Sequence, residues 1–277
     1  MPDTWLTVRE WPELILQRLE DAGVARVVLN RPERRNALNP PLVEAFFGAL
    51  EEIRADRELK VVITKGNGPV FSSGLDLYFL RGASQGPPGD WDRPGTTIEL
   101  SLALRDFPRI TIAQVHGYCL GGSLGLMNMH DLVFAAENAQ IGMPEVPRGS
   151  FGQVATSTLY HSGIPIKKAA MIQLLAKNVT GAEADRLGLV SLAVPEDELE
   201  STTNQYAREL ASRHLGTLQH AKIAVQMGRD LSLADAIKVD RLTGARQSLA
   251  VNPVGDIEGY LHAQKGGPDM SYKRPDV

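Results

Sequence analysis

Two adjacent glycines near the middle of the chain, Gly121 and Gly122, constrain the fold more than any other feature. The run at residues 110–115 before them is apolar, rich in β-branched residues and of strand length. Apolar residues recur after the glycines, on a segment that is long enough for about three helical turns. The sequence therefore predicts a strand, a tight glycine turn and a helix in direct succession.

Such a turn presents backbone N–H groups at the positive end of a helix, with no side chain in front of them. An anion, or an oxygen that becomes negative during a reaction, is stabilised there. Gly121 and Gly122 also allow a ligand to approach the backbone closely. The alternative is a turn from strand to helix that binds nothing.

The first part of the chain alternates strand-like and helix-like segments. Residues 14–19 and 24–29 are two strand-like runs joined by a short turn, which predicts a hairpin. Asn39, followed by two prolines, is a typical helix N-cap, and a strand is expected at 59–64. This alternation indicates the α/β class, with parallel strands joined by crossover helices. We also expect a loop without periodicity at 82–95 and helices at 96–106, 155–161, 165–176, 196–214, 217–227 and 232–249.

Charge and cysteine content argue against several kinds of protein. The formal net charge is −4 and there is no basic run, so we expect neither nucleic-acid binding nor attraction to a membrane surface. The single cysteine, Cys119, excludes an internal disulfide and a cysteine-cluster metal site, and the histidines show no metal-ligand spacing. No apolar run approaches the ~20 residues of a membrane span, and the first residues lack a secretion signal. We therefore expect a cytoplasmic protein without a metal.

Four motifs in order resemble the crotonase (enoyl-CoA hydratase/isomerase) superfamily. The central motif is VHGYCLGG at 115–122, continued by DLVFAAENAQIGMPE at 131–145. The others are NRPERRNAL at 30–38, FSSGLDL at 71–77 and GAEADRLGLVS at 181–191. The similarity covers roughly residues 12–265. It implies an α/β crotonase-like core of repeated ββα units in a spiral at residues 1–195. It also implies a helical region at 196–277 that closes the pocket and builds a homotrimer or homohexamer.

The resemblance implies an acyl-CoA thioester as substrate, as in fatty acid metabolism, with coenzyme A as part of that substrate and no separate cofactor. Two backbone N–H groups would stabilise negative charge on the thioester oxygen, and the matching residues are Leu75 and Gly122. Glu145 matches the acid/base residue, which can move a proton if an apolar pocket raises its pKa. The residues implied to contact coenzyme A are Arg34, Ser73, Leu75, Asp76, Leu77, Tyr78 and Gly122.

The chain departs from the hydratase pattern at one position. Enoyl-CoA hydratases carry a second glutamate three residues after the second glycine, where this chain has Gly125. A single carboxylate suits double-bond isomerisation, and hydratase-lyases also keep only one. Gly149-Ser-Phe151 resembles a branch of C–C bond hydrolases, which has an aspartate where this chain has Gly152. Arg148 stands where aryl hydratase-lyases have a tryptophan, and it either meets a polar acyl group or lies in solvent.

Two further classes are alternatives. Gly121-Gly-Ser-Leu-Gly125 fits G-x-S-x-G, the nucleophile elbow of serine α/β-hydrolases, with Ser123 as the nucleophile. Against this, an elbow serine follows its strand directly, whereas His-Gly-Tyr-Cys-Leu-Gly-Gly intervenes in this chain. The other class is an acyl-CoA binder without catalytic activity, which the missing carboxylate at Gly125 would fit. If that carboxylate limits hydration, Gly125→Glu should raise water addition, provided that the longer side chain fits.

Overall fold

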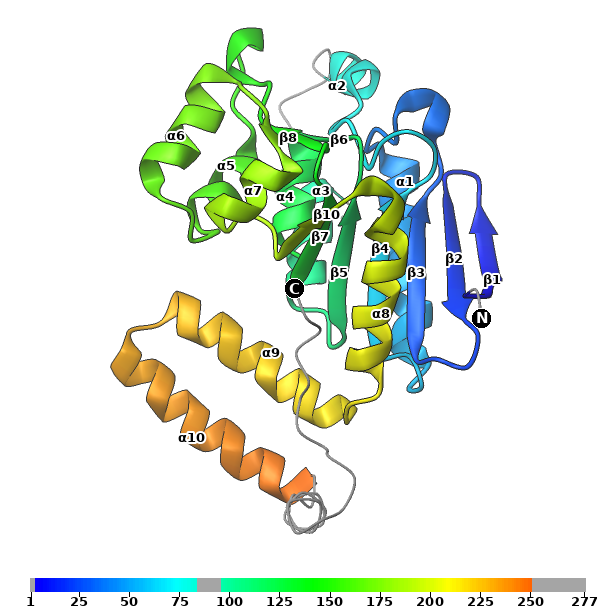
Figure 1. The fold of residues 1–277 in the computed structure, drawn as a ribbon, viewed down its shortest axis with the longest axis vertical. Coiled ribbons are helices and arrows are strands. Elements are labelled where there is room, and N and C mark those ends of the chain that lie inside the picture. Colours follow the sequence, from blue (N-terminus) through cyan, green and yellow to red (C-terminus); the bar gives the residue numbers. More distant parts are fainter. Residues whose placement is uncertain (1–2, 84–95, 251–277) are drawn as a thin grey trace. The chain divides into compact units, whose positions relative to one another are not determined.

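The computed structural model describes residues 3–83 and 96–250 of the chain (Figure 1). Contacts divide the chain into two compact units, one that ends at Arg213 and one that begins at His214. All β-strands of the described residues belong to the first unit, and the described residues of the second unit form helices.

The strands of the first unit form two sheets. The seven-stranded sheet contains, in spatial order, β1 (Trp5–Trp11), β2 (Leu14–Leu19), β3 (Val24–Leu29), β4 (Val61–Gly66), β5 (Ile110–Val115), β7 (Leu132–Ala136) and β10 (Leu192–Val194). The three-stranded sheet contains β6 (Tyr118–Leu120), β8 (Gln140–Gly142) and β9 (Val179–Thr180). In the large sheet, β1, β2 and β3 pair antiparallel, whereas the strands from β3 to β10 pair parallel.

The chain passes between the two sheets in a repeated order. β5 leads into β6, and α4 (Gly122–Asn128) then returns the chain to β7. β7 leads into β8, and α5 (Gln153–Tyr160), α6 (Ile166–Leu175), β9 and α7 (Gly181–Leu187) bring the chain to β10. Isolated bridges, Leu38 to Leu75 and Ser72 to Cys119, add short extended segments beside the small sheet. The repeated ββα spiral predicted from the sequence is therefore confirmed.

Helices cover both faces of the large sheet. α8 (Leu199–Ala211) packs on β3, β4, β5 and β7, and α1 (Pro40–Ala55) packs on β2 and β3. Figure 1 shows α8 in front of the sheet and α1 behind it. α3 (Thr97–Arg105) contacts both α1 and α4. Because both faces are covered, every residue of β3 and β5 is buried, as is typical of central parallel strands.

Most of the expected elements are present, and one helix is shorter than predicted. The hairpin at 14–29 is confirmed as β2 and β3, and the side chain of Asn39 accepts the N–H of Leu42 at 3.1 Å where α1 begins. The helix after the glycine pair ends at Asn128, so the prediction of three turns was wrong. The ring Nδ1–H of His130 donates to the Leu126 carbonyl at 2.9 Å, which caps the end of α4.

The compact division of the chain lies after Arg213, whereas the sequence placed it at residue 195. The reason is that α8 packs against four strands of the large sheet and so belongs to the first unit. The assignment of catalysis to one part and oligomer formation to the other stays a prediction. The expected loop at 82–95 lies outside the described residues, except that 82–83 end α2 (Leu77–Ala83).

The described residues of the second unit, 214–250, form a helical hairpin. α9 (Leu215–Asp230) and α10 (Leu233–Ala250) pack on each other, with Leu218 and Ala236 buried. The exposed fractions of Val225, Leu233 and Leu242 are 75 %, 78 % and 73 %. Apolar side chains that protrude in this way fit the contact surface expected of an oligomer, which stays a prediction.

Candidate active site

One cavity, of about 820 Å³, brings together every site residue that the sequence predicts. Its walls come from the first loop around residue 34, the segment 73–78, the start of α3, the glycine turn and residues 144–155. A space of this size can hold a small organic ligand. The predicted residues that line it are Arg34, Ser73, Leu75, Asp76, Leu77, Tyr78, Gly122 and Glu145.

The glycine turn exposes a backbone N–H at the start of α4. Gly121 has a φ of +56°, a conformation that glycine adopts without strain, and α4 begins at Gly122. The Gly122 N–H therefore has no carbonyl of its own helix to bind. Gly122 lines the cavity, and its α-carbon carries only hydrogen atoms, so no side chain of its own covers this N–H group.

The facing loop holds the Leu75 N–H beside it. Leu38 N–H donates to the Gly74 carbonyl at 2.8 Å, and Asp76 N–H donates to the Leu38 carbonyl at 2.9 Å, so the residues on either side of Leu75 are fixed. A β-carbon placed on Gly122 would lie 3.5 Å from the Leu75 nitrogen. Neither the Leu75 nor the Gly122 N–H is used in a hydrogen bond of the described residues. Two free donors side by side are the arrangement that stabilises a developing oxyanion.

Ser123 links the glycine turn to the segment at 71–76 through buried hydrogen bonds. Its side chain is fully buried, its oxygen accepts the Leu120 N–H at 2.8 Å, and its hydroxyl lies 2.9 Å from the Ser72 carbonyl. A nucleophile elbow instead presents its serine oxygen to the substrate. The structure therefore contradicts the serine-hydrolase alternative and gives Ser123 a role in holding the loops together.

The Glu145 carboxyl lies in a space that two glycines leave open. A β-carbon on Gly121 or on Gly152 would collide with its Oε1 atom. Its Oε2 atom is buried and has no hydrogen-bond partner among the described residues. Burial raises the pKa of Glu145, and its own backbone N–H and the charge of Arg148 oppose that shift only in part. A carboxyl with a raised pKa and a free oxygen is suited to proton transfer.

Two closely packed helices leave little room for a side chain at position 125. α5 lies against α4, and a β-carbon on Gly125 would meet the Ala155 nitrogen at 3.0 Å and a Val154 methyl group at 3.2 Å. These distances are shorter than ordinary van der Waals contact. A side chain at this position therefore requires α5 to shift by a few tenths of an ångström, and the prediction for Gly125→Glu depends on that shift.

Arg34 and Tyr78 form one side of the cavity. The Arg34 guanidinium lies over the Tyr78 ring, 5.2 Å from its centroid, which is a cation–π contact. Tyr78 and Leu77 are 74 % and 58 % exposed, so a ligand could cover both side chains. Ser73 is half-buried in the same wall.

The Asp76 side chain is already occupied by the protein itself. Its Oδ1 accepts the N–H groups of Tyr78 and Phe79 at 3.0 and 3.3 Å, which caps α2, and its Oδ2 pairs with Arg31 at 3.1 Å. Burial acts to raise the pKa of Asp76, but these hydrogen bonds and the Arg31 charge hold it below its ordinary value. Asp76 thus has a structural task that the sequence did not predict.

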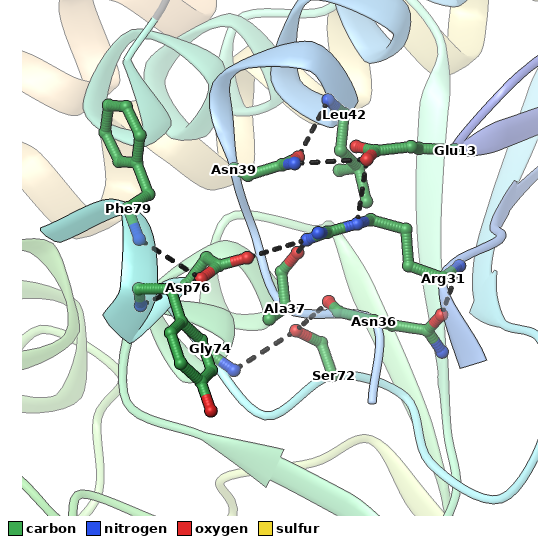
Figure 2. A network of polar contacts seen from close by, with 11 residues as sticks. Glu13, Arg31, Asn36, Ala37, Asn39, Leu42, Ser72, Gly74, Asp76 and Phe79 are labelled. Carbon is green, nitrogen blue, oxygen red and sulfur yellow. Dashed lines mark hydrogen bonds and ion pairs between the residues drawn. The ribbon is translucent and has the colours of Figure 1, made fainter. Parts of the chain in front are cut away.

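Sequence reasoning missed two residues that support the site, Arg31 and Asn36. Both lie inside the motif at 30–38, where only Arg34 was predicted to act. The Asn36 amide oxygen accepts the Arg31 backbone N–H at 2.9 Å (Figure 2). The Asn36 amide nitrogen donates to the Val70 carbonyl at 2.8 Å. Its φ of +51° is one that asparagine tolerates, and this turn chemistry was the signal that could have identified it.

The profile of a protein family described as enoyl-CoA hydratase/isomerase matches residues 20–246 of the chain. The chain belongs to the enoyl-CoA hydratase/isomerase family. The family and the crotonase-like fold predicted from the sequence are thereby confirmed. Within the described residues, none of the helices combines the length and apolarity that crossing a membrane requires, and no group of His, Cys, Asp and Glu residues there could hold a metal ion.

Three similar proteins illustrate this relationship. The rat protein enoyl-CoA hydratase domain-containing protein 3, mitochondrial, is 32 % identical over 238 residues, which cover 84 % of this chain and 78 % of that protein. A structure of a monofunctional enoyl-CoA isomerase from M. smegmatis is 30 % identical, with a TM-score of 0.69 over 82 % of this chain and 99 % of the other. An enoyl-CoA hydratase structure from Mycobacterium smegmatis, 21 % identical, shares the fold with a TM-score of 0.83 over 91 % and 97 % of the two chains.

Proposed function

We propose that this family member shifts double bonds in enoyl-CoA thioesters, with Glu145 as the only acid/base group. The observation that carries the proposal is geometric: the Glu145 carboxyl and the free N–H groups of Leu75 and Gly122 line the same cavity. The 30 % identity to a protein described as a monofunctional enoyl-CoA isomerase supports the same reaction.

The chemistry follows from these three groups. The ionised Glu145 carboxylate removes a proton from the carbon next to the thioester carbonyl, and the electron pair moves onto the carbonyl oxygen. The Leu75 and Gly122 N–H groups stabilise that enolate oxygen, and losing one such donor typically costs about 3 kcal/mol. Glu145 then returns the proton to the far carbon of the conjugated system, so the double bond moves and no water is consumed.

Hydration is less well supported, because a water molecule must be both oriented and split across the double bond. In hydratases two carboxylates share that work, and the second is replaced in this chain by Gly125. A β-carbon at that position would lie 3.0 Å from the Ala155 nitrogen and 3.2 Å from a Val154 methyl group, so the space beside it is narrow. One carboxyl can move a proton between two carbons without help, which is why isomerisation is the better match.

Specific contacts distinguish the other candidates. A hydratase-lyase keeps one glutamate and is the second candidate, with Arg148 in the cavity wall where it can meet a polar acyl group. A C–C bond hydrolase would need an aspartate in place of Gly152, where a β-carbon would lie 2.8 Å from Glu145 Oε1. A binder without activity would not require a buried carboxyl with a raised pKa and a free oxygen.

Coenzyme A itself is proposed to lie against the Arg34 side of the cavity. Arg34 would meet a phosphate, and the exposed side chains of Leu77 and Tyr78 would cover the pantetheine arm or the adenine. No separate cofactor or metal enters the proposed reaction. A homotrimer or homohexamer in the cytoplasm also remains our proposal, and the rat relative carries the word mitochondrial in its name.

The test is a panel of enoyl-CoA thioesters in deuterated buffer, analysed by mass for exchange, isomerisation, hydration and cleavage. The proposal predicts a shifted double bond and little water addition, with deuterium in the product only to the extent that the protonated Glu145 carboxyl exchanges with solvent before it returns the proton. If water addition is the main reaction, the protein is a hydratase and the proposed isomerase activity is wrong. Failure to bind any acyl-CoA at millimolar concentration in calorimetry would refute the substrate class.

A further inference from the structure

The segment that carries Leu75 contains no helix or strand and is held in place by a buried arginine from another part of the chain. Arg31 lies just after β3, and only 8 % of its surface is exposed. It is outside the set of residues that line the cavity. Its contacts nevertheless reach the segment on which the Leu75 N–H depends.

The Arg31 guanidinium joins three separate segments (Figure 2). Its Nε pairs with Glu13 Oε1 at 3.0 Å, in the turn between β1 and β2. Its Nη1 donates to the Ala37 carbonyl at 2.6 Å and pairs with Asp76 Oδ2 at 3.1 Å. The last contact falls on the residue directly after Leu75.

A second group of contacts fixes only the beginning of that segment. The Ser72 hydroxyl donates to the Asn36 carbonyl at 2.8 Å and accepts the Gly74 N–H at 3.2 Å. These bonds lie before Leu75, whereas the Arg31–Asp76 pair and the bond from the Asp76 N–H to the Leu38 carbonyl lie after it. The direction of the Leu75 N–H depends on both sides being held.

We propose that Arg31, acting through Asp76, is the positioning residue that aims the Leu75 N–H into the cavity. The same pair orients α2, because Asp76 Oδ1 caps that helix while Oδ2 is held by Arg31. The inference rests on the proposed function only where it treats the Leu75 N–H as the oxyanion donor. Whether Arg31 fixes the loop can be tested independently of the reaction.

Arginine suits this task better than lysine. The guanidinium is planar and offers donors in several fixed directions, so it can serve Glu13, Ala37 and Asp76 at once. An ammonium group keeps the charge but cannot hold the same fork of contacts. Arg31→Lys should therefore preserve the fold while releasing Asp76, and Asp76→Asn should do the same from the other side, because its amide oxygen can still cap α2.

Arg26 provides a matched control. It is 9 % exposed, lies on β3 and makes a comparable set of contacts, with Gln17 and with Glu200 at 2.7 Å, but it does not line the cavity or touch its loops. Arg26→Lys thus removes an equally buried guanidinium without touching Asp76. Any effect that it shares with Arg31→Lys reflects general loosening of the fold.

The experiment combines hydrogen–deuterium exchange with kinetics on the full-length protein. In Arg31→Lys and Asp76→Asn, we expect faster exchange of the Leu38 and Asp76 amides, which bridge the two loops. We expect kcat to fall about 100-fold, the effect of a displacement of about 1 Å. The Kd of a saturated acyl-CoA should change little, and Arg26→Lys should show neither effect.

Several results would overturn the inference. Unchanged loop exchange in Arg31→Lys and Asp76→Asn would show that Arg31 does not hold the segment. An equal rise in Arg26→Lys, or a parallel loss of kcat and acyl-CoA affinity, would reduce Arg31 to a general structural residue. If the wild-type protein turns over no acyl-CoA, the proposed function fails, and the exchange result alone still decides whether Arg31 holds the loop.

Discussion

Replacing Gly125 by alanine tests the close approach of α4 and α5. The added methyl group would lie 3.0 Å from the Ala155 nitrogen and 3.2 Å from a Val154 methyl group. Because one of these atoms belongs to the backbone, α5 must move as a whole, and overpacking of this kind costs about 1–3 kcal/mol. Alanine favours a helix over glycine by about 1 kcal/mol, so the net destabilisation should be about 0–2 kcal/mol.

Gly228 in α9 is the matched control, because a β-carbon there would meet nothing within 4 Å among the residues that the structure describes. Gly228→Ala should gain the helix preference alone, about 1 kcal/mol, and raise the Tm by roughly 2–4 °C. Gly125→Ala should leave the Tm unchanged or lower it by up to about 8 °C. Calorimetric unfolding of both variants beside the wild-type protein measures the difference.

A rise in the Tm of Gly125→Ala equal to that of Gly228→Ala would refute the close packing of α4 against α5. Gly125→Glu tests the same packing through function. Its longer side chain has to pass the same two atoms, so we expect lower stability and no gain in water addition. Efficient hydration by a stable Gly125→Glu protein would contradict close packing as the reason for the missing carboxylate.

Four further predictions concern Glu145, Arg34 and assembly. Glu145→Gln should lower turnover ~100-fold or more with little change in acyl-CoA affinity, while Glu137→Gln, an exposed control, should leave turnover unchanged in the same assay. Burial raises the folded-state pKa of Glu145, so its stabilising contribution is complete below the unfolded-state pKa and is lost as the pH rises through the folded-state pKa. The Tm of Glu145→Gln should therefore exceed that of the wild-type protein at neutral pH and approach it in acid, and an equal Tm at neutral pH would contradict the raised pKa. Arg34→Ala should weaken coenzyme A binding chiefly at low salt in calorimetry, and a salt-independent loss would argue against a phosphate contact. Sedimentation at micromolar concentration should show a trimer or hexamer, and a monomer would contradict the expected assembly.

The exposed N–H group of the Gly121–Gly122 turn was the part of the candidate site that local sequence could predict, whereas Leu75 was identified from the resemblance to the family. The Leu75 and Gly122 N–H groups line the cavity because glycines on a short turn leave the backbone bare, whatever side chain stands beside them. The task of Asp76 could not be predicted in this way. A carboxylate in that motif can face a ligand or cap the next helix, and in this protein its Oδ2 atom is taken up by Arg31, 45 residues earlier in the chain.

Most strands that the sequence did not predict are too short to show a pattern. Strands β6 and β8 have three residues each and β9 has two, which is too short for any alternation of apolar and polar residues to appear. β1 is long enough, but it lies at the edge of the sheet with Leu6 and Val8 exposed, so it shows no buried face. Longer segments with two covered faces, such as β3, were predicted because burial forces every residue to be compatible with the core.

Two glycines of this chain leave space for neighbouring atoms, a role that turn patterns in the sequence do not reveal. Gly152 has an ordinary negative φ, yet a β-carbon there would lie 2.8 Å from Glu145 Oε1. Gly125 lies within a helix, where glycine is unfavourable, and its missing side chain lets α5 approach. At both positions the glycine leaves space for a neighbouring group, and neither position has a positive φ that calls for glycine. The packing of residues 152–155 against Glu145 and α4 therefore both bounds the space of the Glu145 carboxyl and narrows the space at position 125.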